Sequence, residues 1–242
     1  MEKPRYIVGI DLGTTNSVVS YIDTEEIEDE FSEAEVHIFK IPQIIEPGVV
    51  DELAYLPSFT YIPSEAELSK GDLDLPWAKE MTYVVGSYAA KRGAEVPVRL
   101  ISSVKSWLCH PHLDRTAPIL PWNAPDSLQK RSPVEVSSYY IEHIRRAWNH
   151  VKAEEEQNED YFLENQDVYL TVPASFDAVA RELTVKAAEM AGLSNITLLE
   201  EPQAAFYNWI NSNKKWRKEA QVGDIVLVCD IGGGTTDFSL IE

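Results

Sequence analysis

The sequence contains only two cysteines, Cys109 and Cys229, and they lie far apart in a chain of 242 residues. Two isolated cysteines form neither a disulfide framework nor the paired spacing of a zinc site. Cys229 lies in an apolar segment, and we interpret it as a small buried core residue. The N-terminus lacks the apolar region of a signal peptide, and no apolar stretch approaches the roughly 20 residues of a membrane span. These absences predict a cytoplasmic protein that does not cross a membrane.

Positive charge is scarce, because 21 lysines and arginines face 40 aspartates and glutamates, for a net charge of −19. Such an excess repels the phosphates of nucleic acids and of anionic membranes, so neither is an expected partner. A nucleotide in a pocket is not excluded, because local donors and a cation decide its binding there. Two acidic runs, at 25–30 and 154–160, are interpreted as solvated loops, with an acidic docking site as the alternative.

Two loops rich in glycine and threonine, near opposite ends of the chain, repeat one pattern. An apolar segment at 6–11 leads into LGTTN at 12–16, and another at 225–230 leads into IGGGTTD at 231–237. Each apolar segment ends in an aspartate, Asp11 or Asp230, and a further apolar segment follows each loop. The pattern predicts two β-hairpins with related tips. Either loop alone would fit an ordinary hairpin turn, but duplication makes a shared function the stronger interpretation.

The residue types in these loops suit a polyphosphate and its metal. Glycines have no Cβ, so consecutive backbone N–H groups can gather around an anion, and threonine hydroxyls add further donors. An aspartate at the strand end supplies a hard oxygen ligand for Mg²⁺, directly or through water. Two carboxylates about 5 Å apart repel by roughly 3 kcal/mol at an effective dielectric constant of 20, so a cation between them is stabilising. We therefore predict that the two loops clamp one polyphosphate.

After the first hairpin, the chain contains an alternating stretch and then a long proline-rich stretch. Residues 35–41 alternate and predict a third antiparallel strand. From 42 to 131 prolines are frequent, apolar runs are short and three tryptophans occur, which indicates an inserted α+β subdomain with long loops. It includes a short strand at 83–86 and the start of a helix at 87–91.

Regular structure resumes at a capping box, SPVE at 132–135, which begins a helix that runs to about residue 151. A strand is predicted at 167–173, and Asp177 caps a second helix that Gly192 ends. Another strand at 196–199 precedes a third helix, opened by Glu201 and Pro202. The expected buried faces are Val136, Tyr140, Ile144 and Ala147 or Trp148 on the first helix, and Val179, Leu183, Ala187 and Met190 on the second.

Five motifs together resemble one family. GIDLGTTNS at 9–17 and DIGGGTTD at 230–237 resemble the two phosphate loops of Hsp70/DnaK chaperones, in the actin–hexokinase–Hsp70 ATPase superfamily. TVPASF at 171–176, followed by Arg181, is similar to the family's V-P-A-x-F…R segment, and EEPQAA at 200–205 to its N-E-P-T-A-A segment. SVKSWL at 103–108 lies where the family carries its active-site lysine. Thr236 departs from the bulky side chain common at that position.

The resemblance implies an α/β fold. The expected fold is an actin-like, ribonuclease H-like ATPase lobe, with a mixed β-sheet flanked by helices and an inserted α+β subdomain. We predict that 1–41 and 132–222 form the core of the first lobe, that 42–131 form the insertion, and that 223–242 form the first hairpin of a truncated second lobe. The chain is thus expected to be the N-terminal portion of an Hsp70-like ATPase domain.

The resemblance also implies roles for individual residues. Asp11 and Asp230 would lie around Mg²⁺, mostly through its waters, and Lys105 would neutralise charge during phosphoryl transfer. Glu201 would orient a water near the metal, and Asp230 and Thr235 would also belong to the catalytic set. The phosphate-binding residues would be Gly13, Thr14, Thr15 and Asn16 from the first loop and Gly232, Gly233, Gly234 and Thr235 from the second.

Each assignment has a simpler alternative. Lys105 is otherwise a surface lysine on an amphipathic helix, and Glu201 otherwise favours its helix through the dipole. Pro173 and Arg181 resemble residues that transmit the nucleotide state to a second site, but they also fit a strand terminator and a solvated charge. Asp237 fits either a site residue or a turn residue.

We expect the nucleotide-binding part of an Hsp70-like molecular chaperone, with ATP or ADP and Mg²⁺ as ligands and ATP hydrolysis as the activity implied by resemblance. Residues that grip adenosine, and a peptide-binding domain, would follow Glu242, so the chain alone is expected to be weak or inactive. A J-domain co-chaperone or a nucleotide-exchange factor is the implied partner. The alternatives are a sugar kinase, a filament-forming bacterial actin, or a non-catalytic interaction module with the same fold.

Overall fold

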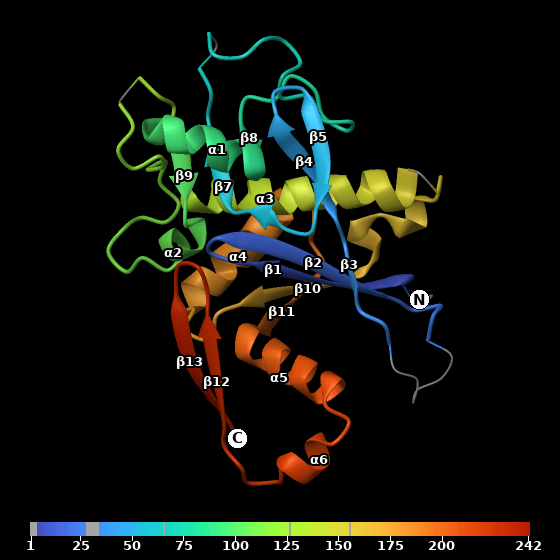
Figure 1. The fold of residues 1–242 in the computed structure, drawn as a ribbon. Coiled ribbons are helices and arrows are strands. Elements are labelled where there is room, and N and C mark those ends of the chain that lie inside the picture. Colours follow the sequence, from blue (N-terminus) through green and yellow to red (C-terminus); the bar gives the residue numbers. More distant parts are fainter. Residues whose placement is uncertain (1–3, 28–33, 65, 126, 155) are drawn as a thin grey trace.

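A central mixed β-sheet organises the chain (Figure 1). The computed structural model describes residues 4–27, 34–64, 66–125, 127–154 and 156–242. The strand order is β11-β10-β1-β2-β3, and β6 pairs with the other end of β2. Strands β1 and β10 are parallel, as are β10 and β11, whereas β1 and β2 form an antiparallel hairpin. The strands are β1 (Tyr6–Leu12), β2 (Asn16–Asp23), β3 (His37–Ile38), β6 (Leu56–Pro57), β10 (Asp167–Val172) and β11 (Ile196–Glu200).

Helices cover the sheet unequally. In Figure 1, α3 (Pro133–Trp148) and α4 (Ala178–Met190) lie on one face, and α5 (Glu201–Ser212) lies on the other. Alternate residues of β1 and β10 point into the core beneath α3 and α4, among them Val8, Ile10 and Leu170, each at most 1% exposed. The mixed sheet flanked by helices confirms the predicted fold class. No helix in the ranges described is long and apolar enough to cross a membrane.

The predicted capping box at the start of α3 is confirmed. Ser132 Oγ accepts from the Glu135 amide at 3.2 Å, and Glu135 Oε2 accepts from the Ser132 amide at 3.4 Å. These two bonds satisfy amides that a helix N-terminus otherwise leaves unpaired. The predicted face is buried as well, because Val136, Tyr140, Ile144, Ala147 and Trp148 all lie in the main core.

The predicted buried face of α4 is partly wrong. Val179 and Met190 are about half exposed, at 51% and 50%. The helix instead buries Ala180, Leu183, Thr184, Ala187 and Ala188, a face turned slightly around its axis. Small residues on this face let α4 approach α3 closely, and that packing overrides the simple stripe of large apolar residues.

The segment between β3 and α3 forms two further small β-sheets and two short helices. Strand β4 (Ile41–Glu46) pairs with β5 (Val49–Leu53), and β7 (Phe59–Tyr61) lies between β8 (Val84–Val85) and β9 (Leu100–Ser102). The predicted strand at 35–41 is divided, because β3 joins the central sheet while Ile41 begins β4. Helix α1 (Ser87–Glu95) covers a second apolar cluster, and α2 (Val104–Leu108) follows the 3₁₀ turn Pro97–Arg99 and β9. The proposed domain boundaries stay a prediction.

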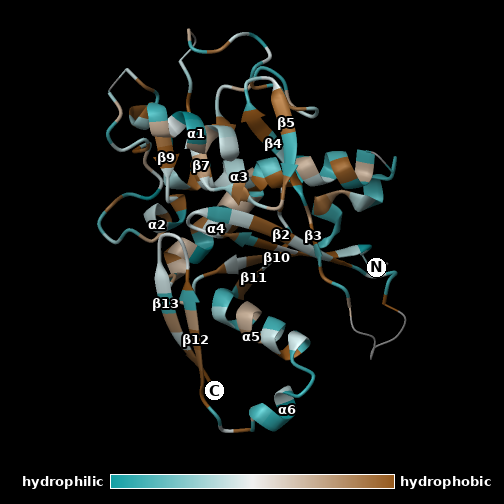
Figure 2. Ribbon diagram, in the orientation of Figure 1, coloured by the Kyte–Doolittle hydropathy of each residue, from teal (hydrophilic) through white to brown (hydrophobic). Residues whose placement is uncertain are grey.

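Short helical turns and a second hairpin complete the fold. A π-helical segment (Asn149–Glu154) extends α3, and two 3₁₀ turns (Glu159–Tyr161 and Leu163–Asn165) lead to β10. After α5, the short helix α6 (Trp216–Glu219) precedes the hairpin of β12 (Val226–Ile231) and β13 (Thr236–Ile241). Both predicted hairpins are thereby confirmed. Figure 2 shows apolar residues in the β12–β13 hairpin, which stands apart from the core, so Cys229 is exposed rather than buried.

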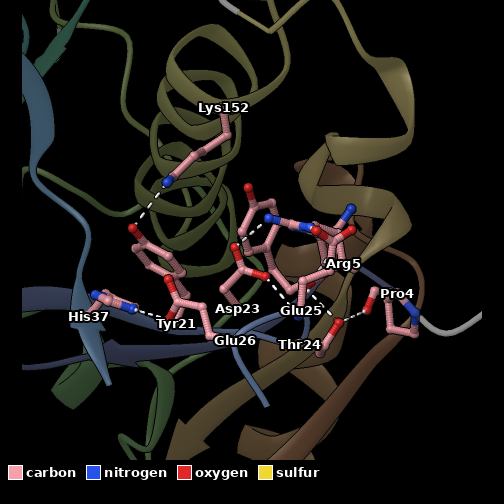
Figure 3. Close-up of polar contacts among 11 residues, drawn as sticks. Pro4, Arg5, Tyr21, Asp23, Thr24, Glu25, Glu26, His37 and Lys152 are labelled. Atoms are coloured by element: carbon pink, nitrogen blue, oxygen red, sulfur yellow. Dashed lines mark hydrogen bonds and ion pairs between the residues drawn. The ribbon is translucent and has the colours of Figure 1, made fainter. Parts of the chain in front are cut away.

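Polar and aromatic contacts hold the sheet at the end remote from the hairpin tips (Figure 3). Arg5 donates to Asp23 Oδ2 at 2.7 Å, and the Lys152 ammonium donates to the Tyr21 hydroxyl at 3.0 Å while lying 4.4 Å from its ring centre. His37 bonds Glu26 of the first acidic run at 2.8 Å. Glu26 and Glu154, one from each run, are exposed as predicted, whereas Glu28 to Glu30 and Glu155 lie outside the described residues.

Candidate functional site

The first glycine–threonine loop joins β1 to β2 and is held by two hydrogen bonds from Ser58. A Cβ on Gly13 would lie only 2.1 Å from the carbonyl oxygen of Asn16, so the turn admits no larger residue there. The Ser58 hydroxyl donates to the Gly13 carbonyl at 2.7 Å, and the Ser58 amide donates to the Thr15 carbonyl at 2.8 Å. Ser58 lies between β6 and β7, and nothing in its sequence context marks it as part of the site.

The two loops, from opposite ends of the chain, lie directly against each other. A Cβ on Gly233 would lie 2.8 Å from Thr15 Oγ1, and one on Gly234 would lie 2.8 Å from Thr14 Cγ2. The second turn is closed by the Gly232 amide, which donates to the Thr235 carbonyl at 2.9 Å. Glycine at these positions therefore permits a close approach of the two hairpin tips, as a two-sided clamp requires.

We expect Gly233→Ala and Gly234→Ala each to weaken Mg-ATP binding about tenfold. The added methyl group meets a threonine at 2.8 Å, and overpacking of this kind costs roughly 1–3 kcal/mol. Gly232→Ala, in the same loop, is the comparison for the clash itself, because a Cβ there lies no closer than 3.4 Å to the Thr235 carbonyl oxygen and meets no threonine of the first loop. Isothermal titration of the three variants measures the effect. Equal affinities for all three would contradict a close clamp.

Asp11 and Asp230 occupy corresponding ends of β1 and β12. Asp11 lies in register with Thr171 of the parallel strand β10, and Thr171 Oγ1 donates to Asp11 Oδ1 at 2.8 Å. This bond fixes the orientation of the carboxylate, a role for Thr171 that the sequence did not suggest. Asp230 lies opposite Asp237 in the hairpin, and Asp237 is 3.5 Å from the Ser175 hydroxyl.

Lys105 and Glu201 meet although they are 96 positions apart in sequence. Lys105 Nζ donates to Glu201 Oε1, and the two side chains are only 15% and 13% exposed. Lys105 is thus held in an ion pair at the site rather than on a free helical surface. Burial raises the pKa of Glu201, and the charges of Asp11 and Asp230 raise it further, while Lys105 opposes the shift.

One open cleft of about 790 Å³ is lined by Asp11, Asp230 and Glu201 together with Thr171. Its wall also includes small residues of α5, Ala204 and Ala205, and residues of β1 such as Ile7 and Gly9. Three carboxylates facing one space create negative potential, and a cation or a basic side chain relieves it. Among the residues described, no group of three or more His, Cys, Asp or Glu is placed to hold a metal directly. The donor set fits a hard cation that keeps most of its waters, as Mg²⁺ does.

Pro173 and Arg181 flank the turn between β10 and α4. The Pro173 carbonyl accepts from the Phe176 amide at 3.1 Å, which closes the turn. Arg181 Nη2 donates to Glu200 Oε1 at 2.7 Å, and its Nε donates to the Phe176 carbonyl at 3.2 Å. Arg181 therefore links this turn to the end of β11, immediately before Glu201, and is not a freely solvated charge.

Comparison with known proteins identifies the family. A family model described as Hsp70 protein matches residues 80–242. The chaperone protein HscA of Xenorhabdus nematophila is 27% identical over 242 residues, covering 98% of this chain and 33% of the relative. The HscA homologue of Cupriavidus necator is 30% identical over 249 residues, covering 98% of this chain and 32% of the relative. The HscA homologue of Actinobacillus pleuropneumoniae serotype 5b is 28% identical over 239 residues, covering 98% of this chain and 33% of the relative. The chain spans about a third of the length of these relatives. It belongs to the Hsp70 family and has the actin-like ATPase fold of that family.

Proposed function

We propose that the two hairpin tips bind the phosphates of ATP or ADP, and that the chain is the nucleotide-binding part of an Hsp70-type chaperone. The observation that carries the proposal is the direct contact of Gly233 and Gly234 with Thr15 and Thr14. Two glycine loops that face each other offer backbone N–H donors from both sides of one anion. Proteins of this family bind ATP and ADP, which supports the same ligand here.

The carboxylates of Asp11 and Asp230 would hold Mg²⁺ through its waters. When bound, Mg²⁺ would neutralise charge on the phosphate oxygens. Thr171 keeps the Asp11 carboxylate in one orientation through its 2.8 Å hydrogen bond. The hydroxyls of Thr14, Thr15 and Thr235 would donate to phosphate oxygens, because a hydroxyl supplies one proton and rotates to suit its acceptor.

Lys105 and Glu201 would carry the hydrolytic step. The Lys105 ammonium pairs with Glu201, which lines the cleft, and would stabilise the charge that develops on the transferred phosphoryl group, where preorganised electrostatics has its largest effect. Glu201 holds Lys105 through Oε1 and would accept a proton of the attacking water at Oε2. Its raised pKa suits a carboxylate that positions water.

Membership of the Hsp70 family favours this function over a sugar kinase or a filament-forming actin. A non-catalytic interaction module with the same fold is the remaining alternative, and nucleotide binding separates the two. Because the chain spans a third of its relatives, coupling to a peptide-binding domain, a J-domain co-chaperone and a nucleotide-exchange factor is proposed on the family's pattern alone.

Calorimetric titration with Mg-ATP tests the proposal. We expect saturable binding with a Kd weaker than about 1 μM, equivalent to less than about 8 kcal/mol, because the proposed contacts are with phosphate and metal. Asp11→Asn combined with Asp230→Asn should remove most of the binding. Asp51→Asn, in the β4–β5 hairpin, is the control. No heat of binding at millimolar Mg-ATP, or equal binding by the double variant, would reject the nucleotide site.

A further inference from the structure

The loop that follows α2 is anchored to the start of α4 by a two-pronged ion pair. Arg115 Nη1 and Nη2 donate to the two carboxylate oxygens of Asp177, each at 2.9 Å. The same guanidinium donates through Nε to the His110 carbonyl at 3.1 Å, so it also holds its own loop in shape. The Arg115 side chain is only 12% exposed. Bidentate pairs of this kind define geometry as well as supplying attraction.

Asp177 is a rigid anchor because it also caps α4. Its Oδ1 accepts from the Ala180 amide at 2.7 Å, which is the N-cap bond of that helix. Helix α4 in turn packs along α3 through a buried face of small residues. The hydrogen bonds from Arg115 and from the Ala180 amide hold the pKa of Asp177 near 2, so the carboxylate stays ionised at neutral pH.

Helix α2 has little to hold it in place by itself. It contains five residues, its N-cap residue Ser103 has a left-handed φ of 55°, and no side chain caps it. A helix this short is not stable without tertiary contacts. Val104 and Leu108 are buried, and Lys105 reaches Glu201 on α5. Figure 1 shows α2 beside α4, on the side of the sheet opposite α5.

We infer that Arg115 is a positioning residue for Lys105. Two ion pairs bracket α2: Lys105–Glu201 ties it to the start of α5, and Arg115–Asp177 ties the loop that leaves it to the start of α4. With both in place, the short helix has one position relative to the cleft. Without Arg115, the Lys105 ammonium would sample positions away from the transferred phosphoryl group. The inference rests on the proposed function, because the value of a fixed Lys105 lies in phosphoryl transfer.

Arg115→Gln tests the inference, with Arg145→Gln as the matched control. Arg145 also bonds two other segments: its Nε donates to the Ala191 carbonyl at 2.7 Å and its Nη1 to Glu164 Oε1 at 2.9 Å. It lies near the C-terminal end of α3. We expect Arg115→Gln to lower kcat for ATP hydrolysis about tenfold with KM changed less than about twofold, since misplacement of a catalytic group affects turnover more than ground-state binding. Arg115→Lys keeps the positive charge but cannot bond both carboxylate oxygens of Asp177 at once, so its kcat should lie between those of Arg115→Gln and the wild type. Arg145→Gln should leave both constants unchanged.

Asp177→Asn completes the test because asparagine is also a good N-cap residue. It should lower kcat like Arg115→Gln, and the double variant should be no worse than either single one. Hydrogen exchange and acylation of Lys105 provide readouts that need no hydrolysis. In Arg115→Gln and in Asp177→Asn, but not in Arg145→Gln, the amides of 104–108 should exchange about tenfold faster and Lys105 should acylate faster.

If the wild-type chain hydrolyses no ATP, the proposed function fails, while faster exchange and acylation still support the anchoring of Lys105. The positioning role is overturned if the exchange and acylation rates match wild type, if Arg145→Gln changes them equally, or if they change while kcat does not.

Discussion

Lys105→Ala should lower the rate of ATP hydrolysis by about 100- to 1000-fold, the usual effect of removing one preorganised charge from a transition-state site. Lys105 forms an ion pair with Glu201, which lines the cleft, and its side chain is 15% exposed. Its removal takes away the charge that would stabilise the phosphoryl group. It also leaves Glu201 buried among the negative charges of Asp11 and Asp230, so the pKa of that carboxyl should rise further.

Single-turnover hydrolysis, with protein in excess over Mg-ATP, measures the effect on the chemical step and compensates for weak binding. Lys91→Ala is the control, since Lys91 of α1 forms an exposed ion pair with Glu46 of β4 at 3.0 Å. Exposed pairs of this kind contribute little, so its rate should match that of the wild type. Equal rates for Lys105→Ala and the wild type would show that Lys105 only supports the fold.

His143 should make the stability of the fold depend strongly on pH. The side chain lies in the interior of α3, where Nε2 bonds the Pro42 carbonyl at 2.9 Å and the ring meets Trp77 edge to face. Burial lowers the pKa of His143 from 6.5 to about 4, and the bond to Pro42 opposes the shift only partly. The folded protein therefore keeps a neutral imidazole that donates from Nε2.

The direction of the effect follows from proton binding. Between about pH 6.5 and pH 4 the unfolded chain protonates His143 while the folded chain does not. The unfolded state binds more protons in this window, so the free energy of unfolding falls as the pH falls. At 1.36 kcal/mol for each pKa unit, the loss between pH 7 and pH 4 is about 3 kcal/mol.

His143→Gln isolates this contribution, because glutamine can donate to the Pro42 carbonyl but does not titrate. Glu142 and Arg146 line the same cavity and are present in both proteins, so their charges are common to both sides of the comparison. Urea unfolding at pH 7 and pH 4 should show the wild type losing about 3 kcal/mol more than the variant. If the stabilities of the two proteins changed in parallel with pH, the folded protein would protonate His143 at the same pH as the unfolded chain does.

The elements that sequence reasoning predicted well are those that local chemistry defines. Ser132 and Glu135 cap α3, and Asp177 caps α4, because a helix N-terminus needs acceptors within three residues. The two hairpins follow from apolar segments that flank glycine-containing turns. The exposure of Val179, Met190 and Cys229 was predicted wrongly, because burial depends on which neighbour covers a surface, and the neighbour is not visible in a local pattern.

Within the site, the residue types were predictable and most of their contacts were not. The duplicated loops indicated a phosphate clamp, and the sequence by itself determined the two turns and the aspartates at the strand ends. Only the tertiary structure decided that Gly233 lies against Thr15 and that Lys105 reaches Glu201.

The supporting contacts of Ser58, Thr171 and Arg115 were likewise decided by the tertiary structure. These contacts depend on the strand order β11-β10-β1-β2 and on the packing of α2 against α3 and α4. Hydrogen bonds within a turn are fixed by neighbours along the chain, whereas contacts across the sheet exist only once distant segments have packed together.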